Sequence, residues 1–367
     1  MILQINKMYE PDIGGVETVV RDYSELLNKY EKVIVLCISK QFTLKTKIEN
    51  INNVKIYRCS SFGTFMSMPI SLSFFIIFFI LGKRARIIHF HEPFPLGTIC
   101  GLLLNRKKRV FITWHSDIIK QKKLKYIIEL IQKYLCKKAE KIITTSQNML
   151  EFSNILYRFK NKTIIIPLSL NRDDYTDNIN LNYISRDLIN LKDNYVLYLG
   201  RFSYYKGLDV LIKSINLIKN EILFVIVGEG ELSEYINKNI KNRNNVILIN
   251  RFVNEEEKKY LLKKSKFLVF PSILPSEAFG IIQIEAMAYG KPVINTSLPT
   301  GVPWVSVHNV SGLTVEPKNI NELTKAIEKL YYDDVLYNEL SKGAFDRFNK
   351  YFEKEKTDKA LLNLYFD

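Results

Sequence analysis

The sequence predicts an α/β protein built from two doubly wound, Rossmann-like domains. Its 367 residues exceed what most single-core domains contain. Short apolar runs of strand type alternate with segments whose apolar residues recur at helical spacing. This alternation occurs twice, separated by a polar stretch over residues 171–194. We therefore expect an N-terminal domain over residues 1–170 and a C-terminal domain over residues 171–352.

Each half contains a series of predicted strands. In the first half these are residues 1–9, 32–39, 85–91, 109–115, 141–146 and 163–168. In the second half they are residues 195–200, 222–227, 245–249, 267–271 and 292–296. Helical patterns between them predict parallel strands joined by right-handed crossovers. Two further helices, over residues 335–352 and 353–365, close the chain.

Composition limits the class of protein. A hydrophobic content of 47% and a charged content of 25% are typical of a globular protein. The first residues lack the basic segment of a signal peptide, and the longest apolar run, 69–81, is shorter than the roughly 20 residues of a spanning helix. That run predicts a buried or an interfacial helix. The cysteines form no C-x-x-C pair and indicate buried thiols in a reducing cytosol: Cys37, Cys59, Cys100 and Cys136.

Residues 271–292 carry two carboxylates around a glycine. Gly280 permits close approach of the backbone to a ligand. A helix that begins near Phe279 would direct its free N–H groups and its positive dipole end at an anion. Glu285 would lie nearly two turns inside this helix, and Glu277 in front of its N-terminus. A solvated acidic residue before a core helix would give the same pattern.

Two cations follow the first strand of the second half. Arg201 and Lys206 would lie where a diphosphate binds at the carboxyl end of a parallel sheet, although they are also two of 53 lysines and arginines. After the next strand, Gly228 and Gly230 lack the third glycine of a dinucleotide fingerprint. This pattern disfavours a Rossmann oxidoreductase.

Polar residues also follow strands of the first half. Gly14 and Gly15 lie at the end of the first strand, where either a ligand or a tight turn would require them. His115 follows a later strand and is expected to face the crevice. His89 and His91 share one face of a strand, but two ligands without a third make a poor metal site.

The segment E-A-F-G-I-I-Q-I-E, residues 277–285, resembles the two-glutamate motif of the retaining glycosyltransferases grouped as family 4, which have the GT-B fold. Other segments match this family in order and approximate distance: Gly14-Gly15-Val16-Glu17, Trp114-His115-Ser116-Asp117, and Leu199-Gly200-Arg201-Phe202 with Lys206-Gly207. The resemblance covers nearly the whole chain. It implies two Rossmann-like domains facing a central cleft, with residues 353–367 packed back on the first domain.

The resemblance implies transfer of a sugar from a nucleotide diphosphate sugar to a hydroxyl acceptor, with retained configuration. Arg201, Lys206 and the N–H groups of residues 279–281 would stabilise the leaving diphosphate. Glu285 would hold the ribose, and Glu277 would orient the donor sugar opposite His115. Further donor contacts are implied for Gly14, Gly15, Gly228, Val253, Phe279, Gly280 and Ile281. Acceptor-side roles are implied for His91, Glu92 and Asp117.

Residues 300–305 and 114–121 look most like bacterial mannosyl- or rhamnosyl-transferases that build O-antigen. We therefore expect a lipid-linked saccharide acceptor and a GDP-sugar in preference to a UDP-sugar, as substrate and with no cofactor. The chain has no Asp-x-Asp pair, and its adjacent doublets at residues 173–174 and 333–334 would point to opposite faces of a strand. This predicts catalysis without a metal ion.

The net charge of +15 is confined to the first half. Residues 1–170 contain 27 lysines and arginines against 12 acidic residues, whereas residues 171–367 contain 26 of each. The lysine-rich segment 120–141 has apolar residues at helical spacing, which suits either an interfacial helix or a core helix with a basic face. We expect a cytoplasmic protein that binds the anionic inner face of the plasma membrane through its first domain. Nucleic-acid binding is the alternative use of this charge, but aromatic residues do not interleave with the basic runs.

Overall fold

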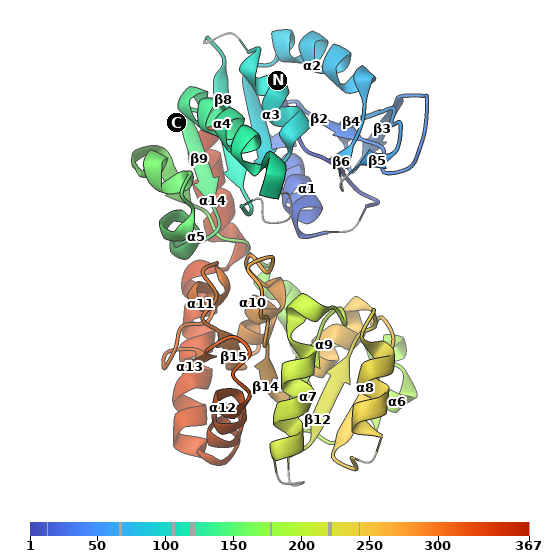
Figure 1. The fold of residues 1–367 in the computed structure, drawn as a ribbon, viewed down its shortest axis with the longest axis vertical. Coiled ribbons are helices and arrows are strands. Elements are labelled where there is room, and N and C mark those ends of the chain that lie inside the picture. Colours follow the sequence, from blue (N-terminus) through green and yellow to red (C-terminus); the bar gives the residue numbers. More distant parts are fainter. Residues whose placement is uncertain are drawn as a thin grey trace. The chain divides into compact units, whose positions relative to one another are not determined.

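The computed structural model describes residues 1–12, 14–65, 68–104, 107–117, 122–176, 178–218, 222–241 and 243–366. Contacts within the chain divide it into two compact units. Unit 1 comprises Met1–Ile166 with Ala360–Asp367, and unit 2 comprises Pro167–Lys359. Each unit has its own largely parallel sheet with helices on both faces (Figure 1), so both are the doubly wound α/β units that the sequence predicts.

Unit 1 is built on an eight-stranded sheet in the order β10-β9-β8-β7-β1-β2-β4-β3. Its strands are β1 (Ile2–Ile5), β2 (Val33–Ile38), β3 (Lys47–Ile51), β4 (Val54–Cys59), β7 (Ile87–Glu92), β8 (Arg109–Trp114), β9 (Lys141–Thr144) and β10 (Thr163–Ile165). A separate two-stranded sheet contains β5 (Thr64–Phe65) and β6 (Met68–Pro69). All six strands predicted in this half are present.

The prediction of a purely parallel sheet is wrong at one edge of unit 1. β3 pairs antiparallel with β4, and neither strand was predicted. Asn52 and Asn53 turn the chain between them, both at positive φ, the backbone conformation of a tight hairpin turn. Three of the five residues of β3 are exposed, so this edge strand lacks the apolar run by which buried strands are recognised.

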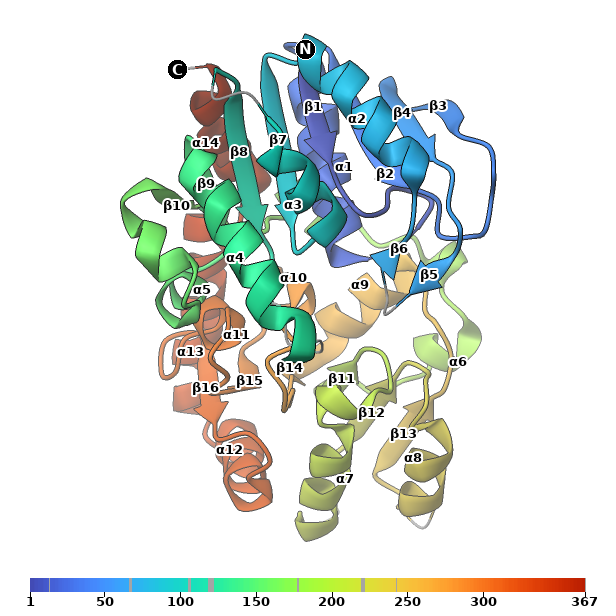
Figure 2. The same ribbon diagram turned by 45° about the horizontal axis from the view of Figure 1, so that its top comes forward.

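Helices cover both faces of this sheet. They are α1 (Gly15–Asn28), α2 (Leu72–Arg84), α3 (Pro95–Leu102), α4 (Lys122–Lys138), α5 (Gln147–Phe152), the 3₁₀ helix η1 (Leu156–Lys162) and α14 (Lys354–Phe366). Figure 2 shows α2, α3 and α4 in front of the sheet. On the other face, Leu361 and Tyr365 of α14 join Val20 and Leu27 of α1 in one buried core. From Ala360 onward the last helix therefore packs within unit 1, whereas residues 353–359 belong to unit 2.

Unit 2 is built on a six-stranded sheet in the order β13-β12-β11-β14-β15-β16. Its strands are β11 (Tyr195–Leu199), β12 (Phe224–Val227), β13 (Val246–Ile249), β14 (Ser265–Val269), β15 (Val293–Thr296) and β16 (Gly312–Val315). Every neighbouring pair among these described strands is parallel. The five predicted strands are confirmed, and the short edge strand β16 was not predicted.

Two buried cores cover the faces of this sheet. One contains side chains of α7 (Leu208–Leu217), α8 (Ser233–Ile240) and α12 (Ile320–Tyr332), and the other those of α9 (Glu255–Lys264), α10 (Ile281–Ala288) and α13 (Asp334–Tyr351). The remaining short helices of this unit are η2 (Arg172–Tyr175), η3 (Leu181–Tyr183), α6 (Arg186–Ile189), η4 (Tyr204–Lys206) and α11 (Val302–Val305). Ile184 and Leu188 are buried in the second core. The polar stretch 171–194, which separates the two alternations in the sequence, is therefore part of unit 2.

Two helical glycines give a test of the packing in both units. A Cβ at Gly343 of α13 would lie 1.8 Å from the carbonyl oxygen of Val310, whereas a Cβ at Gly82 of α2 would meet only side chains at 3.7 Å or more. We predict that Gly343→Ala lowers the free energy of unfolding by about 1–3 kcal/mol. The matched Gly82→Ala should raise it by up to about 1 kcal/mol through helix propensity. Urea denaturation would measure both, and equal effects of the two variants would contradict the observed packing.

Candidate active site

The turn between β14 and α10 requires a glycine at its end. Gly280 has φ of 80°, in the left-handed region, and caps the N-terminus of α10, which begins at Ile281. A Cβ on Gly280 would lie 2.5 Å from the ring of Phe270. Side chains are therefore excluded at this position for two reasons, strain and lack of space. The helix α10 therefore begins directly after this glycine, which itself places no side chain over the first N–H groups.

Glu277 and Lys206, predicted from separate segments, form an ion pair. Lys206 Nζ lies 2.5 Å from Glu277 Oε2 and 5.0 Å from the centre of the Phe270 ring. The hydroxyl of Ser272 donates to the same carboxylate oxygen at 3.3 Å. Both charged side chains are largely buried, with 16% and 11% of their surface exposed. The pair is therefore shielded from solvent, and the attraction between its charges is screened less than in a surface ion pair.

A second glycine fixes the position of Lys206. Gly207 has φ of 69°, and a Cβ there would lie 2.0 Å from the carbonyl oxygen of Pro271. The turn after β11 therefore packs directly on the turn after β14. The backbone N–H of Ile273 also donates to the carbonyl of Tyr205 at 2.8 Å. These contacts place the cation of one turn against the carboxylate of the other.

Glu285 lies in the second turn of α10 and is almost fully buried. Its Oε1 accepts hydrogen bonds from Lys258 Nζ at 2.6 Å and from the Tyr175 hydroxyl at 2.9 Å. Burial lowers the pKa of Lys258, but the carboxylates of Glu285 and Glu255 outweigh it, so the pKa lies above its usual value. Burial, followed by the charge of Glu285, raises the pKa of Tyr175. Neither partner of Glu285 was singled out from the sequence.

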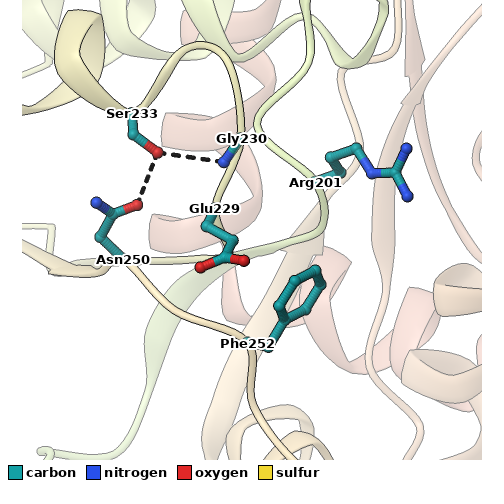
Figure 3. Close-up of a pocket in the computed structure, with 6 residues that line it drawn as sticks. All are labelled: Arg201, Glu229, Gly230, Ser233, Asn250 and Phe252. Atoms are coloured by element: carbon teal, nitrogen blue, oxygen red, sulfur yellow. Dashed lines mark hydrogen bonds between the residues drawn. The ribbon is translucent and has the colours of Figure 1, made fainter.

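A pocket of about 490 Å³ opens beside the turns that follow β11, β12 and β13. Figure 3 shows the residues that line it: Arg201, Glu229, Gly230, Ser233, Asn250 and Phe252. Ser233 Oγ donates to Asn250 Oδ1 at 2.8 Å and accepts from the N–H of Gly230 at 3.2 Å. The ring of Phe252 stands beside the Glu229 carboxylate, and 71% of Phe252 is exposed.

The residues expected around this pocket are only partly those that line it. Arg201 is a lining residue, and its side chain extends away from Phe252 and Glu229 (Figure 3). Gly228 supports the wall, because a Cβ there would lie 2.0 Å from the carbonyl oxygen of Gly200. Val253 is partly buried against the second core of unit 2. The resemblance implied a donor contact for Val253, after β13, and missed the exposed ring of Phe252.

The glycine loop of unit 1 lies before α1. Gly14 is the extended N-cap of this helix, and the carboxylate of Glu17 folds back over it. A Cβ on Gly14 would lie 2.2 Å from Glu17 Oε2, whereas a Cβ on Gly15 would meet nothing within 4 Å. Ile13 of the same loop lies outside the described residues. Gly15 therefore leaves open space at the start of α1, and its predicted contact with the donor stays a prediction.

His91 and His115 are in direct contact inside unit 1. His91 Nδ1 lies 3.1 Å from His115 Nε2, and the rings are stacked. Burial lowers the pKa of His115 to about 3, and burial with the neighbouring histidines holds the pKa of His91 well below its usual value. His89 Nε2 contacts the hydroxyl of Thr113 at 2.7 Å. Both ring nitrogens of His89 and of His91 have hydrogen-bond partners within the protein.

Glu92, expected on the acceptor side, is a buried carboxylate that holds the start of α3. It accepts from the N–H of Phe94 at 3.1 Å, from the Thr98 hydroxyl at 2.6 Å and from Gln132 Nε2 at 2.9 Å. Burial raises its pKa. With both oxygens engaged, Glu92 supports the local structure, and its acceptor-side role stays a prediction.

Asp117 accepts hydrogen bonds from two neighbours. Trp114 Nε1 donates at 2.9 Å and the Ser153 hydroxyl at 2.8 Å, both to Oδ1. Residues 118–121, which complete the segment compared with mannosyl- and rhamnosyl-transferases, lie outside the described residues. The bonds to Asp117 tie the strand end that carries His115 to the residues after α5.

Comparison with known proteins agrees with this architecture. Residues 182–347 match the family model "Glycosyl transferases group 1", and residues 13–173 match "Glycosyltransferase Family 4". The chain is 28% identical over 367 residues to an O-antigen chain mannosyltransferase C of Escherichia coli, covering 99% of this chain and 97% of the relative. It is 30% identical over 288 residues to the D-rhamnosyltransferase WbpZ of Pseudomonas aeruginosa, covering 78% and 74%. Among solved structures, Anabaena HepE in complex with UDP superposes with a TM-score of 0.79 at 15% identity, covering 99% of each chain.

The fold and these matches define a glycosyltransferase. The chain belongs to glycosyltransferase family 4, and its two Rossmann-like units are those of the GT-B fold. The alternatives of a Rossmann oxidoreductase and a nucleic-acid-binding protein find no support in these comparisons.

The buried histidines of unit 1 predict a pH dependence of stability. An unfolded histidine titrates near pH 6.5. His89 and His115 take up protons in the folded protein only near pH 3, so the unfolded state binds more protons between these values. Stability should fall as the pH drops from about 6.5, by up to about 1.4 kcal/mol per pH unit for each buried histidine.

Urea unfolding at pH 7.5 and pH 5.5 would measure this effect, because carboxylates with ordinary pKa values of about 4 change little over this range. His115→Gln is the matched variant and should show a smaller loss than the wild type. Identical urea midpoints for the wild type at the two pH values would contradict the prediction.

Proposed function

We propose that the protein transfers a hexose, mannose-like in preference, from a nucleotide diphosphate sugar to a lipid-linked saccharide in the synthesis of bacterial surface polysaccharide. The observation that carries the proposal is the similarity to the O-antigen mannosyltransferase over 99% of the chain. The rhamnosyltransferase relative also transfers a sugar, as its name states. A GDP-sugar is preferred to a UDP-sugar on the same basis, and the sugar keeps its anomeric configuration.

In this proposal the main task is to stabilise the departing diphosphate. Negative charge builds on the leaving oxygen, and Lys206, Arg201 and the N–H groups at the start of α10 supply fixed positive charge in unit 2. The diphosphate replaces the Glu277 carboxylate as the partner of Lys206. Glu277 is then free to accept hydrogen bonds from the donor sugar. A β-phosphate oxygen takes the proton of the acceptor hydroxyl, so no protein base is assigned.

The nucleoside would occupy the pocket beside Phe252. An exposed aromatic ring offers a stacking surface to any base, and 71% of Phe252 is exposed. Glu285 would accept hydrogen bonds from the ribose hydroxyls. Lys258 and Tyr175 fix the orientation of this carboxylate, because both donate to its Oε1.

A donor screen tests the proposal directly. Release of nucleotide from GDP-mannose, GDP-rhamnose, UDP-glucose and UDP-N-acetylgalactosamine would be measured with and without a lipid-linked oligosaccharide. Acceptor-dependent release from a GDP-hexose is expected. Release from none of these donors in the presence of acceptor would contradict the proposal.

Substitutions in unit 2 should separate catalysis from nucleotide binding. Arg201→Ala and Lys206→Ala should each lower kcat/KM, because each removes a charge-assisted contact to the leaving group. The transition-state stabilisation lost in each variant should exceed about 2 kcal/mol. Glu285→Ala should mainly raise KM for the donor. Lys213→Ala removes an exposed lysine of α7 and is the control. Wild-type kcat/KM in all three site variants would show that the site lies elsewhere.

We further propose that the reaction needs no divalent cation, since Lys206 and Arg201 supply the positive charge that a metal ion would provide. Turnover should be the same without EDTA and with about a 5-fold or about a 50-fold molar excess of EDTA over protein. Loss of turnover with EDTA and recovery with magnesium or manganese would refute this.

We propose that unit 1 binds an anionic membrane surface, where a lipid-linked acceptor is found, and that the protein acts at the inner face of the plasma membrane. Among the described residues, no helix is long and apolar enough to cross a membrane. Instead α2 buries Phe74 and Phe78 and exposes one apolar stripe to solvent, Leu72, Ile76 and Ile80, at helical spacing. Lys83 and Arg84 follow in its last turn.

Helix α4 shows the same division. It buries Ile128 and Leu135 and exposes four large side chains: Tyr126, Ile127, Leu130 and Tyr134. One stripe of this helix packs in the core and another is solvent-exposed, which leaves room for the interfacial role beside the core role. Figure 2 shows α2 and α4 on the same face of the unit 1 sheet, with α3 between them. Apolar side chains with lysines around them suit the boundary between lipid headgroups and acyl chains.

Vesicle binding should depend on the apolar stripe of α2. We expect the wild type to co-sediment with anionic vesicles, less so at high salt and little with neutral vesicles. The triple variant Leu72→Ser, Ile76→Ser, Ile80→Ser should lose binding. The matched control replaces three exposed apolar residues of unit 2, Leu181, Leu217 and Val335, by serine and should bind normally. Equal binding of both triple variants would contradict this surface.

A further inference from the structure

Three of the four histidines in the sequence form a stacked column inside unit 1. His89 and His91 lie two positions apart on β7 and so share a face of the sheet, and His115 follows β8. Ring centroids are 4.6 Å apart between His89 and His91, and 5.3 Å apart between His91 and His115. All three side chains are almost fully buried. Buried polar rings must find partners within the protein.

The partners form one connected chain of hydrogen bonds. His91 Nε2 lies 2.9 Å from Gln4 Oε1, and Gln4 Nε2 donates to the Tyr365 hydroxyl at 3.3 Å. The Tyr365 hydroxyl also contacts His89 Nδ1, and His89 Nε2 contacts the Thr113 hydroxyl at 2.7 Å. The chain thus runs across β1, β7, β8 and the C-terminal helix α14, all within unit 1.

The partners determine which nitrogen carries each proton. Burial lowers the pKa values of the three rings, so each is neutral near pH 7 and has one N–H and one lone pair. The amide oxygen of Gln4 only accepts, so His91 carries its proton on Nε2. His91 Nδ1 is then a lone pair that faces His115 Nε2. His115 must donate through Nε2, which leaves its own lone pair on Nδ1.

We propose that Gln4 and His91 are positioning residues that fix His115 with its proton on Nε2, so that His115 can meet a sugar hydroxyl only as a hydrogen-bond acceptor, through Nδ1. The inference about the sugar rests on the proposed function. It specifies that the contacted sugar position carries a hydroxyl that donates. It also means that His115 does not protonate the leaving group, because its one proton is held by His91.

Nitrogen NMR of histidine-labelled protein at pH 8 reads the tautomer directly. The wild type should show His115 with the proton on Nε2, and His115→Gln assigns the signal. His308 is an internal reference for this form, because its Nδ1 accepts the N–H of Thr314 at 3.0 Å. His91→Asn keeps an acceptor oxygen at the position of Nδ1 and should preserve the tautomer. His91→Leu offers no acceptor and should give a mixture of tautomers.

Kinetics separates positioning from folding. We expect His91→Leu to lower kcat/KM about tenfold or more, as loss of an orienting partner does at other sites, and His91→Asn to recover most of it. Gln4→Met removes the oxygen that accepts from His91 Nε2, so its tautomers and kcat/KM should resemble those of His91→Leu. It provides a second variant if His91→Leu folds poorly. A wild-type His115 with its proton on Nδ1, or an unchanged tautomer in both His91→Leu and Gln4→Met, would overturn the proposal.

The NMR measurement needs no substrate. If no donor is turned over but the tautomers behave as expected, the positioning by Gln4 and His91 stands and the proposed function fails. If donors are turned over and the tautomer does not respond, the positioning fails and the function stands.

Discussion

The site in unit 2 depends on the contact between two turns. Gly207 lies against the carbonyl of Pro271, and Gly280 lies against the ring of Phe270. Neither position has room for a side chain, and both have left-handed backbone conformations. The result is that Lys206 meets Glu277 and that α10 begins directly after the turn that carries Glu277. Charge and backbone donors are thus preorganised before any ligand binds, which is the condition for effective stabilisation of a transition state.

In unit 1, the carboxyl end of the sheet contains buried polar side chains. Parallel strands that are buried on both faces are normally apolar throughout. β7 begins with two isoleucines but ends in His89, Phe90, His91 and Glu92, all buried. Such polar interiors are stable only when every group is satisfied, and the partners of these side chains come from β1, β8, α14 and α4. The carboxyl end of this sheet is therefore held rigidly by hydrogen bonds where a core would otherwise be packed with apolar side chains.

Much of this architecture could be predicted because buried parallel strands are continuous apolar runs. β3 has mostly exposed residues and β16 is a short edge strand that begins at Gly312, so neither gave that signal. Within the site, Glu277, Glu285, Arg201 and Lys206 belong to local segments that resemble a family. The residues that form hydrogen bonds with them do not belong to such segments. Tyr175 reaches Glu285 across 110 positions of sequence, and Gln4 reaches His91 across 87, so only the fold reveals these contacts.

The central claim is that Lys206 holds the diphosphate of the donor in exchange for Glu277. Calorimetric titration of GDP and of UDP into the wild type, Lys206→Met, Glu277→Gln and the double variant measures it most directly. The account predicts that Lys206→Met weakens binding of the better nucleotide about tenfold or more, as expected for loss of a charge-assisted bond. It predicts that Glu277→Gln binds at least as tightly as the wild type, because Lys206 is released. Unchanged affinity in Lys206→Met, with either nucleotide, would contradict it.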